Sequence, residues 1–308
     1  MRPGHGWGPA FGALVALGCA SAHGGPPAPV LEFRIDLGKR TEFFEGEPIY
    51  AVLTVRNASA DTIQITHSGL IEPWLQWSLR RSDGTHVPHR PDVHVDWECA
   101  ARSGVCRIPT DPLAPGAARY RPVVLQRFWG DEGPLYHGSF SYDLPAGGYV
   151  LDASFRSDDS VAASVAALPV SFRVRPRTQR EDTAYAEFVR WGAIDVRQWT
   201  DANLDSALTW VSQRLASDSA DPFSAALLTS SAARTERPPI DSAKIVRYYD
   251  LMLAIAQAQA MRPLGAFAAI YLVGSGFKHF GHPTLDVRAR LGATLAGDVA
   301  REFARRYQ

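Results

Sequence analysis

The pattern of apolar residues changes once along this chain, at residues 175–177, and the two patterns predict different secondary structure. Before this point, short apolar runs with a two-residue alternation are separated by glycine, proline and asparagine, which is typical of strands joined by turns. After it, apolar residues recur every three or four positions, the spacing that places them on one face of a helix. We therefore expect an α+β two-domain chain, with an antiparallel β-sandwich over residues 30–176 and an all-α helical domain over residues 180–308.

The strand pattern and the turns within it indicate a sandwich of the immunoglobulin type. Ser82-Asp83-Gly84-Thr85 is a hairpin signal, because aspartate and glycine readily adopt the backbone conformations of tight turns. The expected strands cover residues 30–35, 48–55, 62–65, 74–79, 119–125, 148–155 and 168–174.

Several turn motifs occur in an order that resembles bacterial Ig-like domains, including those of the intracellular proteinase-inhibitor type. The motifs are Phe44-Glu45-Gly46-Glu47-Pro48-Ile49, Asn57-Ala58-Ser59, residues 77–84, Leu113-Ala114-Pro115-Gly116 and Leu144-Pro145-Ala146-Gly147-Gly148-Tyr149. The resemblance covers roughly residues 31–174 and implies an Ig-like antiparallel β-sandwich, with Tyr149 as a tyrosine corner whose hydroxyl bonds to nearby backbone. It also implies an alternative function, inhibition of proteases through a sandwich loop, although a shared fold does not by itself transfer an activity.

The second half of the chain predicts consecutive helices. Asp201 and Asp241 are expected to cap two of them, because a carboxylate accepts hydrogen bonds from the first backbone N–H groups of a helix. Helices are expected over residues 183–194, 201–216, 223–234, 241–261 and 264–273, with a last helix whose apolar face is Leu291, Leu295, Val299 and Phe303. We expect a small bundle docked on the sandwich, since no constant period of a helical-repeat protein is present.

Residues 1–22 have the layout of an export signal. Arg2 is followed by an apolar segment at residues 7–17 that is too short to span a bilayer. Ala16-Leu17-Gly18-Cys19 resembles a bacterial lipobox, which implies lipidation of Cys19 and attachment to a membrane. Family lipoboxes usually begin with leucine or another larger apolar residue. The alternatives are cleavage after Ala22, which would release a secreted chain, and an uncleaved anchor. We expect an extracytoplasmic protein in which residues 23–29, rich in glycine and proline, form a tether.

The cysteine count agrees with export. The three cysteines are Cys19, Cys99 and Cys106. If Cys19 takes lipid or is removed with the signal, Cys99 and Cys106 remain as a pair in an oxidising compartment, where disulfides persist. We therefore expect a Cys99–Cys106 disulfide that closes a short loop.

A long excursion from residue 86 to residue 111 separates two of the expected strands, and such loops on a rigid sandwich commonly bind ligands. It contains three histidines and several carboxylates, which are suitable ligands for zinc or copper. His86, His89, His94 and Asp96 are the candidate metal ligands, although their spacing matches no closed metal motif. The alternative is a solvated polar loop.

The overall charge narrows the classes of partner. The chain has 32 basic and 32 acidic residues, whereas a nucleic-acid-binding protein needs an excess of positive charge. We expect the protein to bind neither nucleic acid nor a cofactor. Its expected partner is an envelope protein, and the lipid anchor is expected to attach it to the membrane.

The sequence carries no recognisable catalytic motif. Val273-Gly274-Ser275-Gly276 is not a nucleophile elbow, because that motif has glycine where Val273 stands. Our leading hypothesis is a non-enzymatic binding or scaffold module of the cell envelope. The alternatives are the protease inhibitor and a metal-binding protein or enzyme that uses the His86–His94 cluster.

Overall fold

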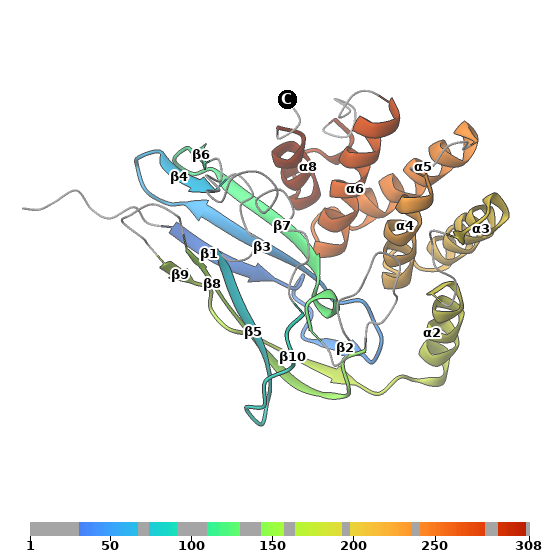
Figure 1. Cartoon of the computed structure of the whole chain (residues 1–308), viewed down its shortest axis with the longest axis horizontal. Helices are drawn as coiled ribbons and strands as arrows, with labels where there is room; N and C mark the ends of the chain where they lie inside the picture. Colours follow the sequence, from blue (N-terminus) through green and yellow to red (C-terminus); the bar gives the residue numbers. More distant parts are fainter. Residues whose placement is uncertain are drawn as a thin grey trace, which may run out of the picture.

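The computed structural model describes residues 31–66, 74–90, 110–129, 143–156, 164–192, 198–235, 241–280 and 289–305. In this part of the chain an N-terminal set of β-sheets is followed by helices, so the expected fold class is confirmed (Figure 1). Among the described residues, no helix is both long enough and apolar enough to cross a membrane.

Two sheets face each other in the N-terminal half and enclose its core. The first has the order β1–β3–β7, and the second has the order β2–β10–β8–β5, with β9 beside β8. Their pairings are antiparallel except that β2 runs parallel to β10. The strands are β1 (Leu31–Asp36), β2 (Glu42–Phe44), β3 (Tyr50–Asn57), β5 (Leu75–Arg81), β7 (Ala118–Val124), β8 (Gly147–Arg156), β9 (Ser164–Ala166) and β10 (Val170–Arg175).

A separate two-stranded sheet contains β4 (Ile63–Thr66) and β6 (Thr110–Leu113). The expected excursion therefore ends earlier than residue 111, because Thr110 and Asp111 already pair with Thr66 and Ile65. Most of the remaining excursion, residues 91–109, lies outside the described residues.

The tyrosine corner is confirmed. The Tyr149 hydroxyl donates a hydrogen bond of 2.6 Å to the Pro145 carbonyl oxygen, and the ring stacks on Phe172 in the core between the sheets. The last expected strand starts two residues late, at Val170, because Leu168 is exposed and Pro169 has no backbone N–H to donate to a sheet.

The helices after β10 follow the expected order. They are α2 (Gln179–Gly192), α3 (Asp201–Ser217), α4 (Pro222–Thr235), α5 (Ser242–Ala258), α6 (Pro263–Phe280) and α8 (Leu295–Arg305). Asp241 caps α5 as expected, and its carboxylate accepts a hydrogen bond of 2.9 Å from the Ala243 N–H. The expected cap of α3 is wrong by one residue, because Thr200 is the N-cap and Asp201 is the first helical residue.

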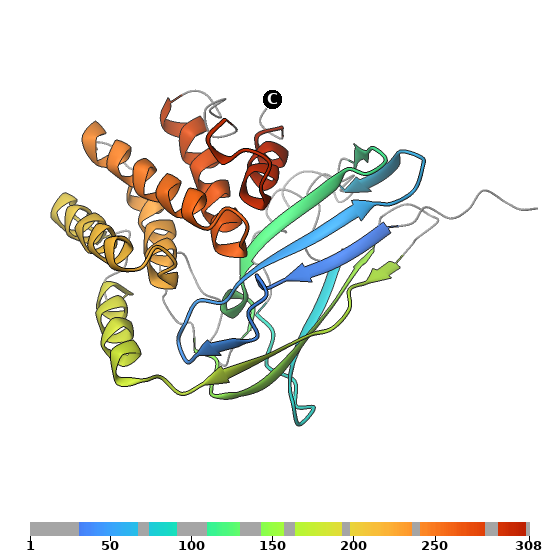
Figure 2. The same cartoon turned by 180° about the vertical axis from the view of Figure 1, so that it is seen from behind.

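The helical half packs on the outer face of the β1–β3–β7 sheet (Figures 1 and 2). Val52 of β3 forms a buried cluster with Ala266 of α6 and Val299 of α8. Tyr50 of β3 and Val124 of β7 belong to the core of the helices. Strand β3 is therefore covered on both faces, which explains its nearly continuous apolar sequence.

Candidate binding site

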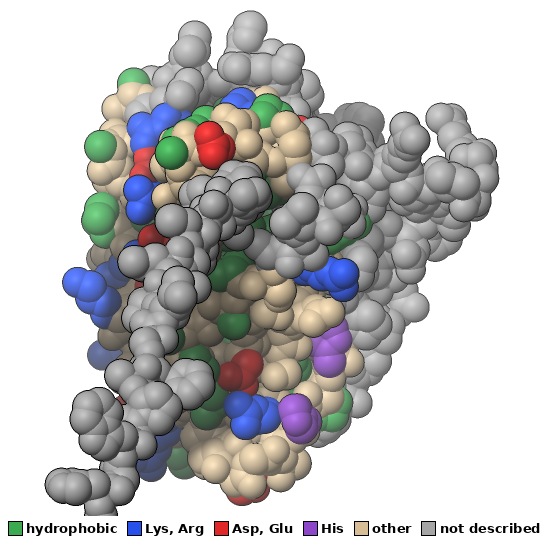
Figure 3. Space-filling view, turned by 90° about the vertical axis from the view of Figure 1, so that its left-hand side faces the viewer, with side chains coloured by type: hydrophobic (Ala, Val, Ile, Leu, Met, Phe, Trp, Pro, Cys, Tyr) green, Lys and Arg blue, Asp and Glu red, His purple; other side chains and the backbone are tan. Residues whose placement is uncertain are grey.

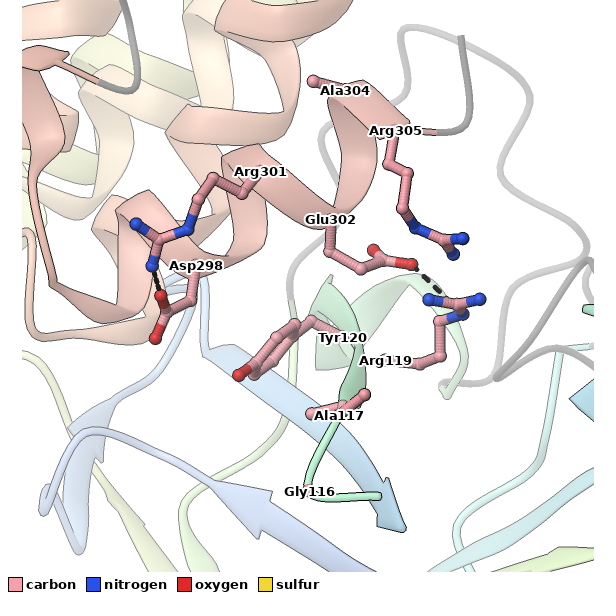
Figure 4. Close-up of a pocket in the computed structure, with 10 residues that line it drawn as sticks. Gly116, Ala117, Arg119, Tyr120, Asp298, Arg301, Glu302, Ala304 and Arg305 are labelled. Atoms are coloured by element: carbon pink, nitrogen blue, oxygen red, sulfur yellow. Dashed lines mark ion pairs between the residues drawn. The ribbon is translucent and has the colours of Figure 1, made fainter. Parts of the chain in front are cut away.

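A pocket of about 530 Å³ lies at the seam where the last helix meets the edge of the sandwich (Figure 4). Ligand-binding pockets in proteins commonly have volumes of this order. One wall is the start of β7 with the turn before it, and the other wall is α8. The lining residues are Gly116, Ala117, Ala118, Arg119, Tyr120, Asp298, Arg301, Glu302, Ala304 and Arg305.

Strand β7 places two neighbouring polar side chains on different sides of the seam. Successive residues of a strand point to opposite faces, so Arg119 and Tyr120 diverge (Figure 4). Tyr120 packs beside the Val52 cluster under the helices. Because β7 is the last strand of its sheet, Arg119 can extend beyond the sheet edge to reach α8.

Helix α8 supplies four charged side chains along one face. Asp298, Arg301, Glu302 and Arg305 follow one another at steps of three, one and three residues, which align on the surface of a helix. Asp298 forms an ion pair with Arg301 one turn away. The pocket wall on α8 thus alternates negative and positive charge along the helix axis.

Buried ion pairs connect this helix to the sandwich. Arg119 is only 4% exposed, and its Nε lies 3.4 Å from Oε1 of Glu302, which is also buried. An Nη atom of Arg119 lies 3.4 Å from an oxygen of Asp111 on β6, which is 3.9 Å from Arg305. Burying charges is costly unless they are paired, so this set of charges ties β6, β7 and α8 into one arrangement.

Tyr120 contributes a hydroxyl group that points toward the Asp298 side of the pocket (Figure 4). Burial raises the pKa of this hydroxyl, because the charged phenolate would lose its hydration, and the nearby Arg301 partly offsets the rise. The hydroxyl therefore stays protonated at neutral pH and can donate a hydrogen bond to a ligand.

The metal ligands expected from the sequence are only partly described. His86 and His89 are exposed on the sandwich, where His86 pairs with Arg80 and His89 pairs with Trp129 through isolated β-bridges. Figure 3 shows histidine side chains at this surface. His94 and Asp96 lie outside the described residues, and within those residues no three histidine, cysteine, aspartate or glutamate side chains gather to hold a metal. The metal site stays a prediction.

The other expected modification sites also fall outside the described part of the chain. These are the lipidation site Cys19 and the disulfide partners Cys99 and Cys106.

The pocket between β7 and α8, called the seam pocket below, was not predicted from the sequence. Two signals existed: Arg119 stands at the start of an apolar strand, and Glu302 stands between the apolar residues Val299 and Phe303 of α8.

Comparisons with known proteins show distant similarity of fold. No protein-family model and no curated protein matches this chain. The CARDB domain of a Pyrococcus furiosus protein aligns with 48% of this chain and 89% of its own length, at 12% identity and a TM-score of 0.24. Native α2-macroglobulin from Escherichia coli, from domain MG7 to the C-terminus, aligns with 91% of this chain and 55% of its own length, at 12% identity and a TM-score of 0.25. These two proteins are only distantly similar to this chain, in which a β-sandwich is followed by helices.

Proposed function

We propose that this protein is an exported, lipid-anchored binding module of the cell envelope that acts without catalysis, and that the seam pocket is its ligand site. The observation that carries the proposal is the construction of the pocket. Its two walls come from the two halves of the chain, and a buried ion pair between Arg119 and Glu302 joins them. A concave site with a few convergent polar groups is the usual form of a small-molecule site.

The docking of the two halves supports a preformed site. Besides the Val52 cluster, the Tyr50 hydroxyl on β3 donates a hydrogen bond of 2.7 Å to the Pro222 carbonyl oxygen at the start of α4. Arg177, in the connection between the halves, donates a hydrogen bond of 2.9 Å to the Glu45 carbonyl oxygen. A site held in place before binding loses less conformational entropy when the ligand arrives.

The sequence supports the location of the module. Residues 1–22 have the layout of an export signal, Cys19 is the proposed lipidation site, and residues 23–29 are the proposed tether from membrane to sandwich. In an oxidising compartment the Cys99–Cys106 disulfide would hold the excursion after β5 in one shape.

The intact mass of the mature protein from its native membrane fraction tests this location. We expect acyl chains on an N-terminal Cys19 and two hydrogens fewer than the reduced chain, for the Cys99–Cys106 bond. A chain recovered from the cytoplasm that still begins at Met1 would contradict export, and with it the proposed function.

Release of the native ligand tests the binding role. The full chain is purified from the envelope in mild detergent and then denatured, and the released small molecules are quantified by mass spectrometry. We expect the wild-type protein to release a compound and Arg305→Glu to release a smaller amount of it. Arg34→Glu should release the wild-type amount, since Arg34 lies on β1 and pairs with Glu32. No compound above the level from an unrelated lipoprotein would contradict the proposal.

A further inference from the structure

We propose that the seam pocket binds a short peptide with free ends, two or three residues long. Its carboxylate meets Arg305 and its ammonium group meets Asp298. This inference rests on the proposed binding function and names the class of ligand.

The end of the pocket near Arg305 is suited to a carboxylate. Arg305 is about half exposed, and its ion pair with Asp111 spans 3.9 Å, which is too long for a hydrogen bond. Its guanidinium therefore retains donors for a planar, two-oxygen acceptor. Figure 4 shows the buried Arg119 beside Arg305 at this end of the pocket, where it adds a second positive charge.

The opposite end is suited to an ammonium group. Figure 4 places Asp298 there, with the Tyr120 hydroxyl pointing toward the same side. Among the described residues no hydrogen bond involves this hydroxyl, so its oxygen can accept one from an ammonium group. The ion pair with Arg301 uses one carboxylate oxygen of Asp298, so the second oxygen and the Tyr120 hydroxyl are the partners that remain for an ammonium group.

The carboxylates of Glu302 and Asp111 lie near the two arginines at the Arg305 end and oppose a ligand that carries only negative charge. Their repulsion acts on a peptide carboxylate as well, but a peptide also carries an ammonium group that gains from Asp298 at the other end of the pocket, which a bare anion lacks. The lining side chains carry three guanidinium groups and two carboxylates in alternation. A ligand that carries both signs of charge matches this alternation, whereas one with a single sign does not.

The distance between the two ends sets the length of the ligand. Asp298 and Arg305 are two helical turns apart, which corresponds to about 10 Å along the α8 axis. An extended peptide spans roughly 3.5 Å per residue, so a dipeptide or tripeptide separates its charged ends by about 7–10 Å. The charges of a phosphoethanolamine headgroup are closer together than this, and a pocket of about 530 Å³ accommodates the longer ligand.

Calorimetric titration of the full mature protein tests the proposal with four probes: trialanine, N-acetyl-trialanine, trialanine amide and glycerophosphoethanolamine. We expect trialanine to bind, and we expect blocking either end to weaken binding at least about tenfold, since each block removes one charge-assisted interaction. Arg305→Gln should weaken trialanine at least about tenfold and leave the amide nearly unchanged. Arg34→Gln, a matched change of an exposed arginine on β1, should leave all affinities unchanged.

Three outcomes would overturn the inference. Equal affinity for the free and the blocked peptides would mean that the charged ends are not recognised. Binding of glycerophosphoethanolamine alone would assign the pocket to a lipid headgroup. Binding of no probe, while the envelope-purified protein releases a compound of another class, would refute the peptide and leave the binding module intact.

Discussion

Gly46 lies in the turn after β2, directly against the Tyr185 ring of α2. Its φ is +76°, and a Cβ at this position would lie only 2.8 Å from Cδ2 of that ring. We expect Gly46→Ala to lower the free energy of unfolding by about 3 kcal/mol, from backbone strain and from displacement of the ring. Gly84→Ala is the control, because Gly84 also has a positive φ but no atom near the added methyl group, so its loss should be about 1 kcal/mol. Urea unfolding measures both, and equal losses would contradict the contact with Tyr185.

Glu181 links the first turn of α2 to the end of the sandwich. It accepts hydrogen bonds of 2.7 and 2.6 Å from Arg175 and of 2.8 Å from the Thr178 N–H, and these bonds lower its pKa to about 2. A carboxyl group with a lowered pKa in the folded state stabilises the fold above its unfolded pKa, near 4.5, and this contribution is lost as the pH falls toward 2.

Glu181→Gln should therefore lower stability at pH 7 and should flatten the loss of stability between pH 5 and pH 2. Thermal unfolding at a series of pH values measures this, and Glu32→Gln on β1 is the matched change of a carboxylate outside the Arg175 contact. A Glu181→Gln profile parallel to the wild type would contradict the assignment.

At the scale of the element, Thr200 begins α3 with a capping box. Its hydroxyl accepts a hydrogen bond of 3.2 Å from the Asn203 N–H, and the Asn203 side chain accepts one of 2.9 Å from the Thr200 N–H. Thr200→Ala should destabilise the protein by about 1 kcal/mol, while Thr200→Ser, which keeps the acceptor, should be close to neutral. The midpoint of urea unfolding measures both, and equal effects would show that the hydroxyl oxygen does not cap the helix.

Most elements could be predicted from the sequence because their signal is local. The alternation in β8 and the apolar stripe of α3 are each complete within one segment, and both elements lie within a few residues of their expected positions. The strands β2, β6 and β9 were missed, because three or four residues carry too little periodicity and these strands are defined by their partners. The parallel pairing of β2 with β10 joins opposite ends of the sandwich sequence, which no local pattern indicates.

The seam pocket could not be predicted for the same reason. Arg119 and Glu302 come from opposite halves of the chain, and nothing near either residue in the sequence specifies the other. Arg301 and Arg305 fit the negative end of the last helix, so their charges alone did not indicate a site. The sequence instead predicted a metal site in the excursion, because histidines such as His86 and His89 are close together there in sequence.

At the scale of the whole molecule, substitutions of the Arg119–Glu302 pair measure how much the contact between the two halves contributes to stability. Glu302→Leu should destabilise the chain by roughly 3 kcal/mol, because Arg119 would keep its buried charge and lose one of its partners. The double variant Arg119→Met with Glu302→Leu should recover much of this loss, since both buried charges of the pair are then removed and Asp111 keeps Arg305 nearby.

During urea unfolding, circular dichroism follows the helices, whereas tryptophan fluorescence follows both halves, because tryptophans lie at positions 74, 77 and 129 of the sandwich and at positions 191, 199 and 210 of the helical half. We expect coincident transitions in the wild type, because Tyr50 and Val124 belong to the helical core. Two well-separated transitions in the wild type would contradict a jointly stabilised molecule.

The covering of β3 on both faces has a consequence for the timing of synthesis. The ribosome completes β3 at Asn57, but the helix that covers its outer face begins only at Pro263. At about 5–20 residues per second, the nascent chain carries Tyr50 and Val52 without their cover for roughly 10 to 40 seconds. During that interval the apolar outer face of β3 lacks its cover, so we expect the incomplete chain to aggregate unless it stays unfolded or is bound by a chaperone.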